Sequence, residues 1–388
     1  MDDARPGRTE ECSAASVWRL AMASVAESLV PWDDRRVIGR GLGPLPAGSA
    51  LIVERTLATD APCVDVSLCT TRGDGGDAIL AGLHHERDLP PAWLEQPVWR
   101  SIRDHYRCWT RAGSPWPEPV RSTCHEVRST WLEFDRDQLA TRCPLPSVFV
   151  EARNADAACR QPLGEAVVER FVAAAARPPV GAALQRLWPL LPAEAEPQFL
   201  GVMLPRQPEG VRVCVALPLA GLARFAARIG LPAAAQADGL IALSARRARL
   251  VVVHLDVGER LGPTLGIELK PASPEGWAPL LSDLVREGLC TAGERDALLG
   301  FPGRSGVVRG TAGPAGCAGA AIGAPDRWRD VDACVVVRTL NHVKLVCRPG
   351  RAVAAKAYLH MGPLWRSRRP APTSRSAGAA AGRSARPR

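Results

Sequence analysis

The sequence predicts an α+β fold in which largely antiparallel or mixed sheets pack against helices. Three observations predict it. Candidate strands follow one another in groups instead of alternating strictly with helices. Several segments between these groups have apolar residues at helical spacing and end at clear stop signals. Hydrophobic residues make up 46% and charged residues 23% of the 388 positions, which is the balance of a folded protein.

The first half of the chain is predicted to mix helices and strands. Ser13 is a suitable N-cap for the first helix, and Pro31 follows its end. In the second strand Val64, Val66 and Leu68 alternate with polar residues. The predicted helices are Ser13–Leu29, Asp77–His84, Gln96–Ala112, Leu163–Ala176 and Val180–Trp188, and the predicted strands are Ala50–Arg55, Cys63–Thr70 and Thr130–Asp135.

The second half repeats this mixture. Gly230 and Gly288 each stop a helix, and Thr291 with Glu294 forms a capping box. The turn at 348–351 contains Pro-Gly and joins the last two strands into the clearest hairpin of the chain. The predicted helices are Ala220–Ile229, Trp277–Glu287 and Thr291–Leu299, and the predicted strands are Phe199–Leu204, Val211–Leu217, Leu250–Val257, Thr264–Lys270, Ala333–Arg338, Val343–Arg348 and Val353–Leu359.

We expect a flexible N-terminus at 1–12, followed by two α+β halves at 13–195 and 196–365. A Gly- and Ala-rich segment at 303–324 is predicted to be a mobile loop within the second half. The similar strand contexts of Glu133 and Glu268 suggest that the two halves are related, although the similarity is too short to establish a repeat.

The basic charge belongs mostly to the C-terminal tail. The chain carries a net charge of +9, and the stretch 366–388 holds seven Arg and no acid, which leaves about +2 for the rest. We expect this low-complexity tail to be disordered. An arm that binds nucleic acid is the alternative, but the tail has no aromatic residue for stacking on bases. We therefore expect no nucleic-acid partner apart from this tail.

Cysteine usage predicts a cytoplasmic protein. The chain has 12 Cys, none in a C-x-x-C pair, and several lie in apolar strands where they act as small hydrophobic residues. The N-terminus opens with acidic residues, unlike a secretory signal. Apolar runs fall short of the roughly 20 residues that span a bilayer, so we expect no membrane association. No zinc-binding, nucleotide-binding or hydrolase motif is present, and we expect no metal and no cofactor.

The first candidate site is the C-terminal hairpin. Lys344 and Arg348 share one face of their strand, and Lys356 and Tyr358 share a face of the next strand. Lys344 and Lys356 are two of only three Lys among 49 basic residues, which indicates either a need for ammonium groups or chance. If the two faces coincide, the cluster could bind a diphosphate or a carboxylate. The alternative is an outer sheet face with its charges in water.

A strand Lys-x-Tyr beside another strand Lys resembles the pyrophosphate-binding strands of the αββα-barrel aromatic prenyltransferases. The resemblance covers about twenty residues, 341–360, and its motif is unspecific. It implies that Lys344, Lys356 and Tyr358 shield an allylic diphosphate and that a carboxylate such as Glu268 holds the acceptor. The sequence departs from the family pattern because Tyr occurs only twice in the chain.

The second candidate site pairs Asp256 with Glu268. Both carboxylates interrupt apolar strands, where burial is costly unless the charge is paired. They are therefore candidate catalytic residues, either as a general base or as the partner of a cation. The alternative is turn chemistry for Asp256 and an exposed strand face for Glu268.

Together these observations favour an enzyme that acts on an anionic small molecule or peptide carrying a phosphate or carboxylate. The transfer of a group, similar to aromatic or peptide prenyl transfer, is the reaction class that the resemblance implies. The alternative is a non-catalytic accessory protein that binds a peptide or a protein partner through the same sheet. The two differ in whether the hairpin face lines a pocket or lies on an exposed surface.

Overall fold

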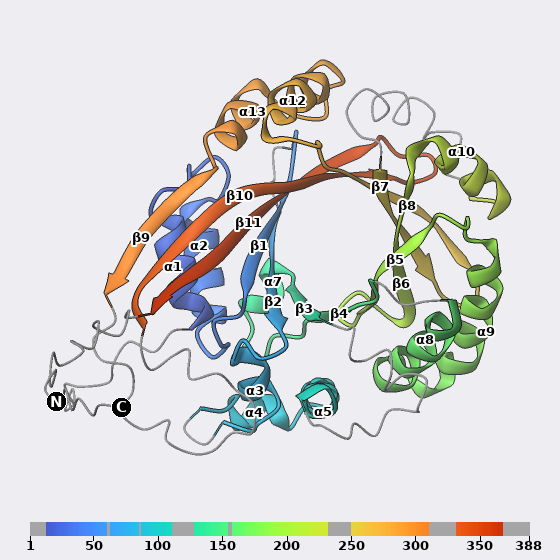
Figure 1. The fold of residues 1–388 in the computed structure, drawn as a ribbon, viewed down its shortest axis with the longest axis horizontal. Coiled ribbons are helices and arrows are strands. Elements are labelled where there is room, and N and C mark those ends of the chain that lie inside the picture. The colour runs from blue at the N-terminus through green and yellow to red at the C-terminus, as the bar shows by residue number, and fades with distance from the viewer. Residues whose placement is uncertain are drawn as a thin grey trace, which may run out of the picture.

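Among the described residues, ten antiparallel strands close into a barrel that helices surround (Figure 1). The computed structural model describes residues 13–59, 63–84, 87–110, 128–153, 157–231, 250–309 and 331–367. The predicted flexible N-terminus, the predicted loop beyond residue 309 and all but two residues of the predicted tail lie outside these ranges.

The strands follow the chain around the barrel. Each of β1 to β8 pairs with its sequence neighbour, β8 pairs with β10, and β10 pairs with β11. The strands are β1 (Ala50–Thr56), β2 (Val64–Thr71), β3 (Ser129–Phe134), β4 (Ser147–Glu151), β5 (Glu196–Met203), β6 (Gln207–Pro218), β7 (Leu250–Val257), β8 (Leu261–Leu269), β9 (Gly303–Arg309), β10 (Val331–Cys347) and β11 (Ala354–Ser367).

Closure depends on the last strand. β11 pairs with β10 on one side and with β1 on the other, so that Tyr358 lies opposite Glu54. The first part of β10 and the last part of β11 continue beyond the barrel, and β9 pairs with β10 in that extension. Strand β9 occupies the beginning of the segment that the sequence predicts as a loop, at 303–309.

The α+β class with antiparallel pairing is confirmed, but the prediction of separate sheets missed the closed barrel. Both predicted halves contribute strands to it, and their boundary falls between the neighbouring strands β4 and β5. The strands predicted at Ala333–Arg338 and Val343–Arg348 are one strand, β10, with an irregularity between Leu340 and His342. The relation between the halves stays a prediction.

Helices cover the outside of the barrel (Figure 1). The capping box predicted at Thr291 is present, with the Thr291 side chain accepting from the Glu294 backbone. No helix among the described residues is long and apolar enough to cross a membrane. The longer helices are α1 (Ala14–Met22), α2 (Trp32–Gly41), α5 (Pro97–Thr110), α8 (Ala157–Phe171), α9 (Arg177–Leu187), α10 (Leu219–Arg228), α12 (Trp277–Arg286) and α13 (Ala292–Leu299), and the short ones are α3 (Gly76–Leu80), α4 (Pro91–Leu94) and α7 (Arg136–Leu139).

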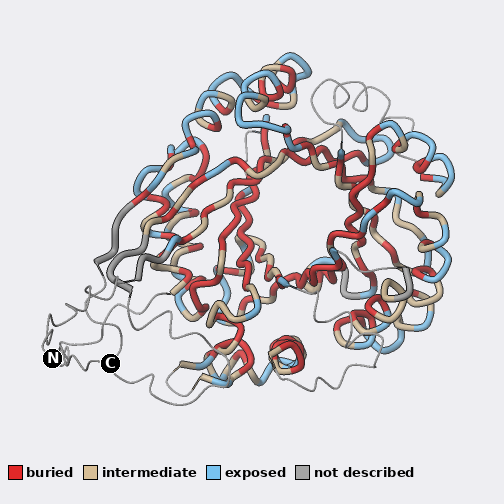
Figure 2. Tube along the Cα trace, viewed as in Figure 1, coloured by how far each residue is buried: buried red, intermediate tan, exposed pale blue. Residues whose placement is uncertain are grey.

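Successive side chains of a strand point to opposite sides, and this alternation separates the hydrophobic core outside the barrel from the polar residues inside it. Most of the length of the barrel strands is buried (Figure 2). The large core beneath the helices includes the fully buried side chains of Val213, Val253 and Ile267. Burying such a side chain contributes about 1.5–3 kcal/mol. The alternate residues point into the barrel, and many of them are polar or charged. Arg212 and His254, next to Val213 and Val253 in sequence, show this pattern because both line an interior cavity.

A smaller apolar cluster lies on the inward side of β3 to β7. There the Phe149 ring packs against Gly201, its partner across β4 and β5. A Cβ atom added at Gly201 would lie 2.2 Å from a ring carbon of Phe149.

We therefore expect Gly201→Ala to destabilise the protein by about 1–3 kcal/mol, because the ring must leave its position in a packed wall. Gly221→Ala is the matched control, since nothing lies within 4 Å of a Cβ there. Thermal unfolding of the two variants checks the prediction, and equal stabilities would contradict it.

Candidate active site in the barrel

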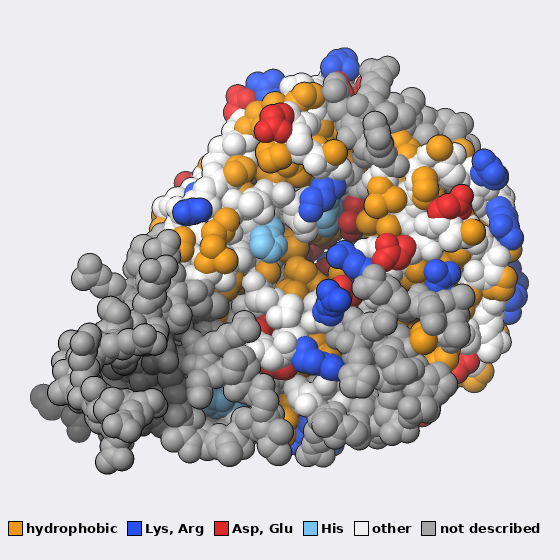
Figure 3. Space-filling model, viewed as in Figure 1, with side chains coloured by type: hydrophobic (Ala, Val, Ile, Leu, Met, Phe, Trp, Pro, Cys, Tyr) orange, Lys and Arg blue, Asp and Glu red, His pale blue; other side chains and the backbone are white. Residues whose placement is uncertain are grey.

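The inward-facing charges gather around a cavity of about 100 Å³ inside the barrel. On the molecular surface, Lys and Arg side chains surround a hollow near the centre of the face shown in Figure 3. Five cations and three carboxylates contribute to the cavity wall. The lining residues are Glu54, Glu133, Arg206, Arg212, His254, Asp256, Thr264, Gly266, Lys344, Val346, Arg348 and Lys356.

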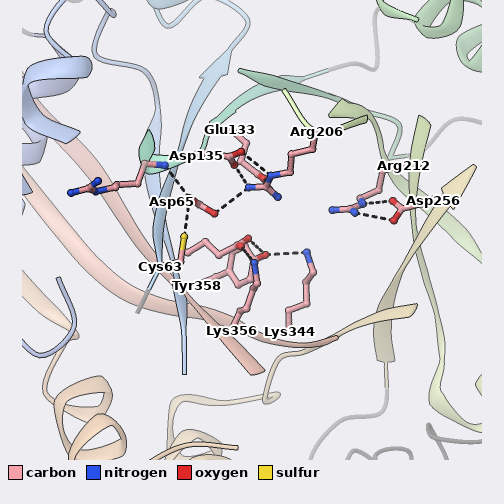
Figure 4. Close-up of polar contacts among 12 residues, drawn as sticks. Cys63, Asp65, Glu133, Asp135, Arg206, Arg212, Asp256, Lys344, Lys356 and Tyr358 are labelled. Atoms are coloured by element: carbon pink, nitrogen blue, oxygen red, sulfur yellow. Dashed lines mark hydrogen bonds and ion pairs between the residues drawn. The ribbon is translucent and has the colours of Figure 1, made fainter. Parts of the chain in front are cut away.

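Lys344 projects toward this cavity from β10 (Figure 4). Lys344 is only 7% exposed, and its Nζ atom donates a hydrogen bond of 3.1 Å to the Oη atom of Tyr358. Burial lowers the pKa of Lys344, although the charge of Glu54 opposes this effect. No carboxylate among the described residues forms an ion pair with this ammonium group. Lys344 is therefore a buried cation whose direct partner is a neutral phenol.

Glu54 on β1 holds the other two members of the hairpin cluster. Lys356 Nζ donates to Glu54 Oε1, and Tyr358 Oη donates to Glu54 Oε2. Burial by itself would raise the pKa of Glu54, but the charges of Lys356 and Lys344 outweigh it and lower this pKa. The same pairing raises the pKa of Lys356 despite its burial. Glu54 and Lys356 are therefore both charged at neutral pH.

Arg206 bridges one side of the site, from the turn between β5 and β6 to the β2 and β3 strands (Figure 4). Its guanidinium donates to Asp65 over 3.1 Å and to Asp135 over 2.9 Å, and it lies 3.7 Å from a Glu133 oxygen. Burial, with the nearby charge of Glu54, raises the pKa of Asp65 and of Glu133. The ionised forms of these two carboxyl groups are thus less favourable here than in water.

We expect Glu133→Gln to stabilise the protein at neutral pH. Because the pKa of Glu133 is raised in the folded state, ionising this carboxyl group costs more free energy there than in the unfolded chain. This cost lowers the stability of the protein once the pH exceeds the pKa of the unfolded chain, about 4.3. Each pKa unit of difference is worth about 1.4 kcal/mol. The melting temperature of the variant should therefore exceed that of the wild type at pH 7, and the gain should vanish near pH 4. The exposed Glu287→Gln is the control, and a gain independent of pH would contradict the prediction.

Arg212 on β6 and Asp256 on β7 are direct neighbours across the sheet. Arg212 Nε donates to Asp256 Oδ1 over 2.7 Å, and a terminal nitrogen donates to Oδ2 over 3.1 Å. This bidentate pair fixes both side chains at the cavity wall. Asp256 therefore lies in the site that the sequence predicts, and its two oxygens hold a guanidinium.

Glu268 belongs to a chain of acid–base groups across four neighbouring strands. His254 Nε2 lies 2.5 Å from Glu268 Oε1, and His342 Nε2 lies 3.5 Å from the same oxygen. Burial and the charge of Lys344 lower the pKa of His254 well below its usual value, so the imidazole is neutral. Since a carboxylate only accepts, Nε2 carries the proton, and Nδ1 accepts from the Cys214 thiol at 3.5 Å. Two neighbours thus fix the ring of His254.

The residues that the sequence singles out come together. Asp256, Lys344, Arg348 and Lys356 line one cavity, while Tyr358 and Glu268 contact its wall. Lys344 and Lys356 face each other across the hairpin. Sequence reasoning missed Glu54, Arg206, Arg212, His254 and His342. A charged residue next to a run of apolar residues in a strand, as at Glu54 and Arg212, is the signal that could have found two of them.

A larger cavity, of about 580 Å³, lies outside the barrel beside Trp93. Prolines and aliphatic side chains dominate its wall, and Arg40 and Arg142 are its charged members. No carboxylate or imidazole is found among the described residues of this wall. It therefore lacks groups for acid–base catalysis. No cluster of His, Cys, Asp and Glu among the described residues could hold a metal ion.

No protein-family model and no curated protein matches the sequence. Solved structures do match. AnaPT from Neosartorya fischeri has a TM-score of 0.51 at 12% identity, covering 89% of this chain and 91% of that one. The 6-dimethylallyltryptophan synthase from Micromonospora olivasterospora, in complex with DMASPP and Trp, has a TM-score of 0.48 at 14% identity, with 91% and 97% covered. The prenyltransferase PriB has a TM-score of 0.47 at 14% identity, with 89% and 94% covered. The likeness to AnaPT shows a shared fold.

Proposed function

We propose that the barrel is the active site of a transferase that binds an allylic diphosphate and passes its prenyl group to an aromatic acceptor. The observation that carries this proposal is Lys344. A buried ammonium group is costly unless an anion compensates it, and the direct partner of this one is a phenol. A diphosphate in the adjoining cavity would supply that anion.

The charges of the cavity wall support the same ligand. The described residues of the wall include two more cations than carboxylates. The cations are Arg206, Arg212, Lys344, Arg348 and Lys356. Guanidinium and ammonium groups that converge on a cavity are the usual partners of phosphate oxygens. The volume of about 100 Å³ is below the roughly 300–1,000 Å³ of complete ligand pockets. We therefore infer that the cavity takes the diphosphate group and that the acceptor lies along the wall beside it.

The proposed reaction breaks the allylic C–O bond, and the bonding electron pair leaves with the diphosphate. A carbon of the aromatic ring then bonds to the allylic carbon, and the ring loses a proton. Glu268 is the proposed proton acceptor because its hydrogen bond and ion pairs with the described residues all involve Oε1, which leaves Oε2 for the proton of the substrate. Asp256 would position Arg212 for the departing diphosphate. No metal is required, because the cations of the wall stabilise the leaving group.

The resemblance of the hairpin to the αββα-barrel aromatic prenyltransferases agrees with this proposal. The shared fold with AnaPT is compatible with it. The structure of the Micromonospora synthase is a complex with DMASPP and Trp. A dimethylallyl donor with tryptophan is therefore the first pair of substrates to test. The cytoplasmic location stays part of the proposal, as does a peptide in place of a free aromatic acceptor.

The experiment is a calorimetric titration of the full chain with dimethylallyl thiolodiphosphate, which cannot readily react. We expect saturable binding that inorganic pyrophosphate displaces. Incubation with dimethylallyl diphosphate and a panel of indole compounds should then give prenylated products in mass spectra, together with free pyrophosphate. A folded protein that binds neither diphosphate compound would overturn the proposal. Binding without any transfer would favour the non-catalytic accessory role.

Glu268→Gln separates binding from chemistry. The variant keeps the shape of the side chain and loses the base, so transfer should slow by about 10²-fold while the thiolodiphosphate binds as before. Glu259→Gln, in the exposed turn between β7 and β8, is the control. Unchanged transfer in Glu268→Gln would remove this residue from the mechanism.

A further inference from the structure

The wall beside the cavity combines aromatic surface with unused hydrogen-bonding groups. Its apolar part is a cluster on the inward side of the β3 to β7 strands, separate from the large core under the helices. The members of this cluster are Trp131, Phe149, Phe199, Met203, Cys214 and Val252. Aromatic side chains present broad flat faces, and these are suited to a flat aromatic ligand.

This wall adjoins the cavity at Glu133. Glu133 lines the cavity and lies opposite Ser147 on β4. Trp131 is two residues before Glu133 on β3 and lies opposite Phe149, so all four side chains share the inward face. The close packing of Phe149 on Gly201 holds the ring in place. The aromatic wall therefore has a defined shape before a ligand arrives.

Two polar atoms of this wall are buried without a hydrogen-bond partner among the residues that the structure describes. They are Ser147 Oγ and Trp131 Nε1, and the Ser147 residue is only 1% exposed. Buried polar groups in folded proteins are nearly always paired, and an unpaired one weakens the fold. An indole N–H only donates and a hydroxyl donates readily. Both would be satisfied by an acceptor atom on a ligand at this wall.

The charge of the surroundings restricts that acceptor atom. Glu133 lines the cavity and is the cross-strand neighbour of Ser147, and Asp65 and Asp135 pair with Arg206, which lines the same cavity. Burial and the charge of Glu54 already make the ionised form of Glu133 unfavourable. The same two effects would act against a ligand carboxylate beside Glu133, but not against a neutral carbonyl oxygen.

We propose that this wall binds the acceptor substrate and selects a flat aromatic molecule that carries a neutral carbonyl group, such as an amide, beside its ring. This inference rests on the proposed transferase function and names the class of its acceptor. The ring would lie on the Phe149 and Phe199 side, and the carbonyl oxygen would accept from Trp131 Nε1 and Ser147 Oγ. The reacting edge of the ring would then face the cavity that holds the diphosphate.

The test compares three indole probes by calorimetry without any diphosphate. Tryptophanamide has the ring, an amine and a neutral carbonyl, tryptamine lacks the carbonyl, and tryptophan replaces it with a carboxylate. We expect tryptophanamide to bind about tenfold more tightly than either of the others, the value of one or two neutral hydrogen bonds. Equal binding of the three probes, or binding of none, would overturn the inference.

Two variants test whether Ser147 and Trp131 cause the preference for tryptophanamide. Ser147→Ala and Trp131→Phe should each reduce the preference for tryptophanamide over tryptamine by about 3- to 10-fold and leave tryptamine unchanged. Ser305→Ala and Trp188→Phe are matched controls, because their polar atoms are also buried and unpaired but lie outside the barrel on β9 and beside α9. An equal effect of the controls, or an unchanged preference in the two wall variants, would overturn the inference.

The two proposals can fail separately. Selective binding of tryptophanamide without any binding of dimethylallyl thiolodiphosphate would contradict the transferase and keep the acceptor wall. Binding of the diphosphate compound, without discrimination among the indole probes, would keep the transferase and remove the acceptor wall. Lys344→Met should leave the binding of tryptophanamide alone unaffected, because this residue belongs to the diphosphate side.

Discussion

Replacing Lys344 with Met should weaken the binding of dimethylallyl thiolodiphosphate by about 10³-fold and abolish detectable transfer. Removing one partner of a buried charge pair costs about 2–5 kcal/mol, and Lys344 is the buried cation that lacks a carboxylate partner among the described residues. Methionine preserves the length and apolar contacts of the side chain. The variant should therefore fold normally, because it also removes a buried charge.

Calorimetry and circular dichroism check this prediction together. Lys270→Met is the matched control, since Lys270 is exposed. Burial lowers the pKa of Lys344, so the wild type should also lose affinity as the pH rises toward that lowered pKa and the ammonium group loses its proton. Undiminished binding in Lys344→Met would exclude the hairpin as the diphosphate site.

Replacing Glu54 with Ala should reduce the free energy of unfolding by about 3–5 kcal/mol, the usual cost of breaking a buried ion pair. The Glu54 side chain is 4% exposed, and its loss leaves Lys356 and the Tyr358 hydroxyl without their acceptor. The double variant Glu54→Ala/Lys356→Met should recover part of this loss, because Lys356 is then no longer left as an unpaired charge, while Lys344 still lacks the nearby charge of Glu54. Denaturant unfolding of the wild type and these variants measures both effects.

The pH dependence of the free energy of unfolding shows whether the Glu54 carboxylate stabilises the folded state. Since the pKa of Glu54 is lowered in the folded state, its contribution is complete above the unfolded pKa of about 4.3 and is lost as the pH falls through the lowered value. The difference in the free energy of unfolding between wild type and Glu54→Ala should therefore stay constant from about pH 6 to about pH 8 and become smaller in acid. The exposed Glu95→Ala is the control, and a difference that grew in acid would contradict the assignment.

The local features of the fold could be predicted from the sequence. Pro349 and Gly350 mark the hairpin turn. Strand alternation gives each strand of the hairpin a charged face, and the structure shows that the two faces coincide, because Lys344 lies opposite Lys356. The carboxylates of Asp256 and Glu268 stand out in apolar strands, and both reach the site. Such signals depend on a few neighbouring residues, which a single sequence contains.

The closed barrel and half of the site could not be predicted in this way. Strand β4 has only five residues, too few for a clear period of two. Glu54 and Tyr358 are separated by 304 positions, and no local pattern specifies that β1 pairs with β11. The prediction therefore identified the cations of the hairpin without the carboxylate that holds them. The role of His254 also depends on a neighbour from another strand, Glu268.

The pairing of β11 with β1 has a consequence for how the protein matures. During synthesis β1 leaves the ribosome early, but its partner strand follows about 300 residues later and the barrel cannot close before then. Until that moment β1 presents an unpaired strand edge, which is prone to associate with other chains. Long-range closure of this kind also makes folding slow. The ligand cavity is consequently among the last features to form, and the nascent chain keeps an open strand edge until then.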